Sequence, residues 1–145
     1  MSVPRLGMGL ALAPVAILAA LAVPACSGGA AVRQVRVSIH YSHFSPPRLD
    51  VPRGSTVRFI VTNSDPIDHE FILGDEALQQ REEAGTDTVH DGTVAGMISV
   101  PAGSTVATVV SFGGSAVPAG GTLVYACHLP GHYAYGMRGT LRLVG

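Results

Sequence analysis

Short segments in which apolar and polar residues alternate are the feature that most constrains the fold of this 145-residue chain. Val35, Val37 and Ile39 alternate with polar residues, and the segment 56–62 (TVRFIVT) has the same pattern. A period of two places one face of a β-strand in a core. Further strands are predicted at 49–51, 69–73, 96–100, 105–112, 122–127 and 139–144, between turns rich in Pro, Gly and Asn. Seven or eight such strands predict an all-β fold, a single antiparallel β-sandwich with Greek-key connections.

One stretch, residues 75–91, departs from this pattern. It holds six acidic residues and one Arg, and its apolar residues show weak periodicity. Within it, residues 77–84 (ALQQREEA) consist mostly of good helix formers and are long enough for about two helical turns. We therefore expect a short helical insertion on the surface of the sandwich.

The first 25 residues predict a secretory signal of the lipoprotein type. Arg5 precedes an apolar run over 6–23, a pattern that also allows a membrane-spanning helix, although glycines and a proline within the run weaken that alternative. The run ends in Val-Pro-Ala-Cys, which resembles a bacterial lipobox and implies cleavage before Cys26 and a lipid on that residue; simple cleavage is the alternative. Residues 26–34 would then be a flexible tether and residues 35–145 the folded domain. The expected location is the extracytoplasmic face of a bacterial cell membrane, or otherwise the periplasm or medium.

Charge and cysteine content restrict the remaining function classes. All nine basic residues are Arg, the formal net charge is −1, and the sequence contains no basic cluster, so we expect no nucleic-acid partner. The two cysteines, Cys26 and Cys127, could form one disulfide, but each has a better explanation in its own local sequence. We expect a monomer.

Cys127, His132 and Met137 lie on one predicted loop at C-x4-H-x4-M spacing. A thiolate, an imidazole and a weak axial thioether, completed by a second His, form a blue-copper electron-transfer site, whereas zinc has no use for the Met. His69 is the best candidate for the second His, because it follows the loop 63–68 and opens a strand.

These residues resemble the cupredoxin family, which includes plastocyanins, azurins, auracyanins and rusticyanin; the ligand loop is most similar to the auracyanin and rusticyanin type. The resemblance covers about 35–145, including the Pro-Arg-Gly-Ser turn at 52–55. It implies one copper ion with His69, Cys127 and His132 as equatorial ligands and Met137 as the axial ligand. Many members have Asn or Ser after the first His, where this chain has Glu70, so a side-chain brace of the thiolate is left open.

The other histidines are expected to lie outside this site. His128 follows Cys127 directly and should point away from the thiolate. His40, His43 and His90 are interpreted as surface or loop residues. A weak second metal site at His40 and His43, or in the acidic stretch with His90, is the lesser alternative.

A copper site of this kind is compatible with three functions. The favoured one is a lipid-tethered carrier that exchanges single electrons with unidentified redox proteins. The resemblance implies a path through His132, with candidate residues of an apolar patch around it at Leu129, Pro130, Tyr133 and Ala134. The alternative is a copper-tolerance protein that sequesters or delivers the ion. A multicopper oxidase is disfavoured, because Ala126 occupies the position where such enzymes have a second flanking His. We therefore do not expect an enzyme.

Overall fold

The computed structural model describes residues 31–87, 89–114 and 121–145. The predicted signal 1–25 and Cys26, the residue predicted to carry a lipid, lie outside the described residues. No helix in the described part is long and apolar enough to span a membrane. The elements, in chain order, are β1 (Arg33–His40), β2 (His43–Ser45), β3 (Arg48–Pro52), β4 (Thr56–Asn63), β5 (His69–Gly74), α1 (Glu76–Ala84), β6 (Met97–Val100), β7 (Thr105–Ser111), β8 (Thr122–Ala126) and β9 (Arg138–Val144).

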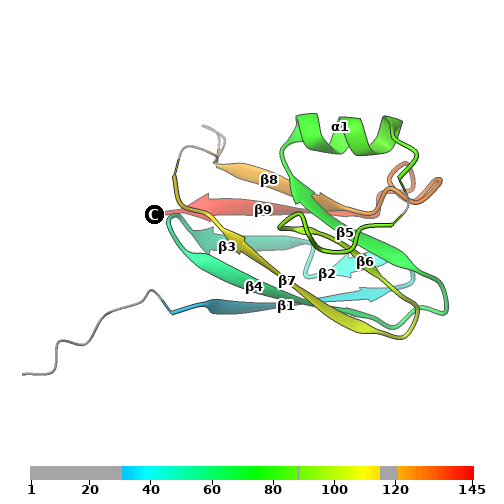
Figure 1. Cartoon of the computed structure of the whole chain (residues 1–145), viewed down its shortest axis with the longest axis horizontal. Helices are drawn as coiled ribbons and strands as arrows, with labels where there is room; N and C mark the ends of the chain where they lie inside the picture. The colour runs from blue at the N-terminus through cyan, green and yellow to red at the C-terminus, as the bar shows by residue number, and fades with distance from the viewer. Residues whose placement is uncertain (1–30, 88, 115–120) are drawn as a thin grey trace, which may run out of the picture.

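Two sheets pack face to face, which confirms the predicted sandwich (Figure 1). One sheet has the order β2-β1-β4-β7 and the other β3-β9-β8-β5-β6. Most neighbours are antiparallel, but β1 pairs with β4 and β3 pairs with β9 in parallel, which the expectation of an antiparallel sandwich did not include. Neither pair is consecutive in sequence, and in both cases the chain passes through the other sheet between the two partner strands.

The core lies between the inner faces of the two sheets. Val37, Ile39 and Phe59 are buried from one sheet, and Phe71 and Tyr125 from the other. Phe71 and Tyr125 stack with ring centroids 5.6 Å apart, and the Tyr125 hydroxyl donates to the Pro46 carbonyl. The alternation seen in the sequence therefore corresponds to inward-facing side chains.

Helix α1 covers the outer face of β5 and β8 (Figure 1). It begins after Asp75, whose carboxylate accepts from the Leu78 N–H at 2.8 Å. Gln79 is fully buried and donates to the carbonyls of Ile72 and Val124 at 3.2 and 2.9 Å. The predicted helix is thus present, one residue longer than 77–84, and it packs on the sheet. This cover explains why the first five residues of β5 are all buried, although β5 does not alternate in sequence.

Candidate metal centre

The four residues singled out from the sequence gather at one end of the sandwich. His69 is the first residue of β5, Cys127 directly follows β8, and Met137 directly precedes β9. The loop that joins β8 to β9 lies at the end opposite the C-terminus (Figure 1). His69, Cys127 and Met137 are at most 1% exposed, whereas His132 is half-buried.

Three donor atoms face one another in this cluster. The Cys127 Sγ lies 3.2 Å from His132 Nδ1 and 4.0 Å from His69 Nδ1, and all three donor atoms lie within 4.8 Å of one another. A first-row metal sits about 2.0–2.3 Å from imidazole nitrogen and thiolate sulfur, so ligands of one ion lie about 3–4 Å apart. The spacing therefore fits three ligands of one ion.

Backbone hydrogen bonds shape the loop that carries His132 and Met137. The Met137 N–H donates to the His132 carbonyl at 3.0 Å, and the Cys127 N–H donates to the Met137 carbonyl at 3.2 Å. Gly131 and Gly136 have φ values of +85° and +90°, which L side chains rarely adopt. These bonds hold the backbone of the buried Met137 beside the backbones of His132 and Cys127.

Asp65, which the sequence analysis did not single out, fixes the orientation of His69. Its carboxylate Oδ2 lies 2.9 Å from His69 Nε2 and accepts a hydrogen bond from that nitrogen. The other ring nitrogen, Nδ1, is therefore the unprotonated one and faces Cys127. The same carboxylate accepts from the backbone N–H groups of Tyr41 and Ser42, both at 2.7 Å. Burial alone would raise the pKa of Asp65, but the hydrogen bonds from Ser42, Tyr41 and His69 outweigh it and hold the pKa below its usual value. Only its position four residues before His69, in a loop, could have indicated this role.

The Glu70 side chain contacts the backbone beside Cys127, whereas it is the Glu70 backbone that hydrogen-bonds the Cys127 sulfur. Its Oε2 accepts from the His128 N–H at 3.0 Å, which ties β5 to the residue after Cys127. Burial raises the pKa of the Cys127 thiol to about 11, against the opposing effect of hydrogen bonds from the Leu129 and Glu70 backbone. In the metal-free protein Cys127 is therefore a protonated thiol at neutral pH.

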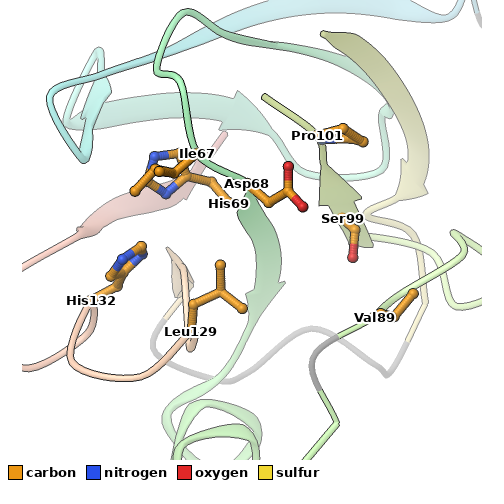
Figure 2. A pocket seen from close by; sticks show the side chains of 8 residues that line it. All are labelled: Ile67, Asp68, His69, Val89, Ser99, Pro101, Leu129 and His132. Carbon is orange, nitrogen blue, oxygen red and sulfur yellow. The ribbon is translucent and has the colours of Figure 1, made fainter. Parts of the chain in front are cut away.

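His132 is the donor that comes nearest to the surface. Burial, and then the neighbouring His69, lower the pKa of His132, which favours the neutral imidazole that a metal requires. Figure 2 shows His132 and Leu129 on the loop facing His69, with Ile67 beside it. These residues line a cavity of about 540 Å³ together with Asp68, Val89, Ser99 and Pro101.

The remaining histidines lie away from the thiol. His128 stacks on Tyr133 and contacts Glu83 at 2.9 Å and Gln79 at 2.7 Å, so it points towards α1 as expected. His40 and His43 face each other across β1 and β2, and the side chain of His40 is largely exposed. His90 lies in the loop between α1 and β6, within the expectation of a surface or loop residue, but its side chain is only 11% exposed because it faces Glu70 of β5 and Glu82 of α1.

The donor set fits copper. A buried thiol, two imidazoles and a buried thioether at the same end of the fold match the soft and borderline ligands of copper electron-transfer sites. A structural zinc ion prefers four Cys, His or carboxylate ligands and gains nothing from a thioether.

Comparison with known proteins agrees with the fold. A family model described as a cupredoxin-like domain matches residues 11–96, which ends before the loop that carries Cys127. Auracyanin from Roseiflexus castenholzii has a TM-score of 0.61 at 20% identity, covering 79% of this chain and 99% of its own. Auracyanin A from Chloroflexus aurantiacus has a TM-score of 0.59 at 22% identity, covering 79% and 100%.

Three curated relatives carry the name copper-resistant cuproprotein CopI. The Rubrivivax gelatinosus protein is 36% identical over 114 residues, which cover 75% of this chain and 65% of that protein. The Pseudomonas aeruginosa protein is 29% identical over 137 residues, which cover 77% and 76%. This chain thus spans somewhat less than two thirds of the Rubrivivax protein. With a family model that matches more than half of its length, the chain belongs to the cupredoxin-like family.

Proposed function

We propose that the protein binds one copper ion through His69, Cys127, His132 and Met137 and transfers single electrons outside the cytoplasmic membrane. The observation that carries the proposal is the close approach of three donor atoms from two separate elements, β5 and the loop after β8. Bound copper would supply a reversible one-electron couple there.

The surrounding residues suit such a role in two ways. Asp65 orients His69, and Glu70 holds the backbone beside Cys127, so the ligands keep their places without help from the ion. His132 reaches the surface beside Leu129 and Ile67, where a redox partner of unknown identity would approach. A buried site with one surface-reaching ligand limits exchange with solvent while still allowing electrons to pass.

A second candidate is copper tolerance, in which the protein sequesters or delivers the ion. The specific observation in its favour is that the curated relatives are named copper-resistant cuproproteins. The same four residues would serve this role. The two candidates differ in whether the electron or the ion is exchanged.

Absorption spectroscopy of the copper-loaded protein tests the site. We expect an intense thiolate-to-Cu(II) charge-transfer band that Cys127→Ser abolishes. His128→Ala is the matched control, because His128 points towards α1, and it should leave the band nearly intact. A colourless copper complex, or equal loss in the two variants, would contradict the ligand assignment.

Electrochemistry separates the two roles. Fast electron exchange together with slow transfer of copper to a chelator supports the carrier. Sluggish electron exchange with ready transfer of copper to an acceptor supports copper handling instead.

We also propose that Cys26 carries a lipid that tethers the domain to the membrane. Support comes from the apolar run and the lipobox-like sequence before it. Intact-mass analysis of protein extracted from membranes should reveal acyl groups on Cys26, and a free thiol at that residue would contradict the anchor.

A further inference from the structure

Two buried polar atoms in the described part of the chain have no hydrogen-bond partner, Glu70 Oε1 and His90 Nε2. They lie 3.6 Å apart, which is too long for a hydrogen bond. The great majority of buried polar atoms in proteins have a hydrogen-bond partner. Two buried atoms that face each other without forming a hydrogen bond therefore suggest a bridging water or ion between them. The neighbouring His128 makes the contrast clear, because both of its ring nitrogens have partners at 2.7–2.9 Å.

A third polar group faces the same nitrogen. Glu82 of α1 places its Oε2 at 3.7 Å from His90 Nε2, so two carboxylates from different elements face one imidazole. An ion about 2.1 Å from two atoms that are 3.6 Å apart makes an angle of roughly 120°, close to the tetrahedral and trigonal values common for such ligands. Each distance is too long for a direct hydrogen bond and suits two ligands of one ion. Among the described residues, however, only the donors of His69, Cys127 and His132 converge as a set of three, so Glu82 would join Glu70 and His90 around an ion only after a change of rotamer.

The backbone around two of these side chains is well fixed. The His90 N–H donates to Ser99 Oγ, and the Ser99 N–H donates to the His90 carbonyl, both at 2.9 Å. Glu70 lies within β5, and its other oxygen accepts from the His128 N–H. The Glu82 side chain is 18% exposed on α1, so it can adjust its rotamer and leaves a path for an ion to enter.

We propose that Glu70, His90 and Glu82 bind one divalent first-row metal ion, Zn²⁺ or Cu²⁺, at a second site distinct from the one at Cys127. Two carboxylates and an imidazole are harder donors than the thiol and thioether of the first site, so this site selects the divalent ion over Cu(I). Three protein ligands leave a further position for water. The site lies beside the first one in sequence and structure, since Glu70 follows His69 and its side chain binds the His128 N–H.

The test uses the full-length protein with its first site already filled by copper. Equilibrium dialysis against Zn²⁺, with metal analysis, should give one additional equivalent of zinc per chain. His90→Ala and Glu82→Gln should each weaken this binding by about tenfold or more. His43→Ala is the matched control, because His43 is an exposed histidine on β2, and it should bind zinc as the parent does. In a parallel arm, added Cu²⁺ should give a second paramagnetic signal without a further thiolate band.

Retention of the copper absorption band reports that each variant is folded. If His90→Ala loses that band, Glu82→Gln decides the question, because its side chain lies at the helix surface. No additional equivalent, unchanged affinity in Glu82→Gln, or loss of binding only in His43→Ala would each overturn the proposal. In the first case His90 is held between the carboxylates by charge or water alone.

Discussion

Removing the carboxylate of Asp65 should weaken both the fold and the metal site. Asp65 accepts three hydrogen bonds, from the N–H groups of Tyr41 and Ser42 and from His69 Nε2. Tyr41 and Ser42 form the tight turn between β1 and β2, and both have positive φ, 51° and 55°. L residues adopt this conformation at a cost of about 1–2 kcal/mol each, so the turn depends on the two hydrogen bonds that Asp65 accepts.

The size of the effect follows from these contacts. Each N–H that loses its acceptor costs about 1–3 kcal/mol, and water can reach this turn because Tyr41 is exposed, so we use the lower part of that range. Asp65→Ala should therefore lower the free energy of unfolding of the metal-free protein by about 2–4 kcal/mol. In a domain of this size that corresponds to a decrease in Tm of roughly 10–20 °C.

Urea and thermal unfolding of the metal-free protein measure this change. Asp68→Ala is the matched control, because Asp68 is three residues away and accepts one exposed hydrogen bond, from the Ala102 N–H at 2.8 Å. The control should lose less than about 1 kcal/mol. Competition with a chelator should also show copper affinity about 10–100-fold lower for Asp65→Ala, because His69 loses its orienting partner. Equal stability of the two variants, or unchanged copper affinity in Asp65→Ala, would refute the reasoning.

Two further predictions follow from buried groups. Burial raises the pKa of Cys127 in the folded protein from its ordinary 9.0 to about 11, so the fold favours the protonated thiol. The resulting contribution to the free energy of unfolding is fully present below pH 9 and is lost as the pH rises to 11. Urea unfolding of the metal-free protein between these pH values should show a loss of about 3 kcal/mol that is missing in Cys127→Ala, and equal losses would contradict the burial of the thiol. Gly139→Ala should lower the free energy of unfolding by about 3 kcal/mol or more, because the added Cβ would lie 2.2 Å from the Tyr125 ring. In the same unfolding assay, Gly113→Ala should change stability little, because the nearest atom to its added Cβ is 3.8 Å away.

The parts of the fold that the sequence predicted are those with local signals. The strands with alternating side chains were found within one or two residues of their observed ends, because alternation records which face is buried. Strand β2 was missed, because the turn before it uses Tyr41 and Ser42 at positive φ instead of the Gly or Asn that indicates such a turn. That turn depends on Asp65, 23 residues away from Ser42, so no local pattern could show it.

The residues of the candidate site also differ in whether a local sequence pattern could predict them. Cys127, His132 and Met137 share one loop, so their spacing was visible in the sequence. The surroundings of His69 depend on contacts between distant segments, such as the one between Glu70 and the His128 N–H, which are 58 residues apart. His90 was interpreted as a surface or loop residue, and its burial could not be predicted because it results from packing against β5, β6 and α1, which are separate segments of the chain.

The arrangement around His69 bears on the choice between carrying electrons and delivering copper. Asp65 holds the ring on one side, and Glu70 ties the adjacent strand to the backbone after Cys127 on the other. To release an ion, His69 would have to turn away, which would break its hydrogen bond to a carboxylate that also supports the turn of Tyr41 and Ser42. His132 is the more exposed of the two histidines, since it is half-buried and lies on a loop, but its carbonyl accepts from the Met137 N–H. If these residues bind copper as proposed, such fixed side chains agree better with the proposed electron carrier than with copper delivery, because electron transfer requires little movement whereas release requires several of these bonds to break together.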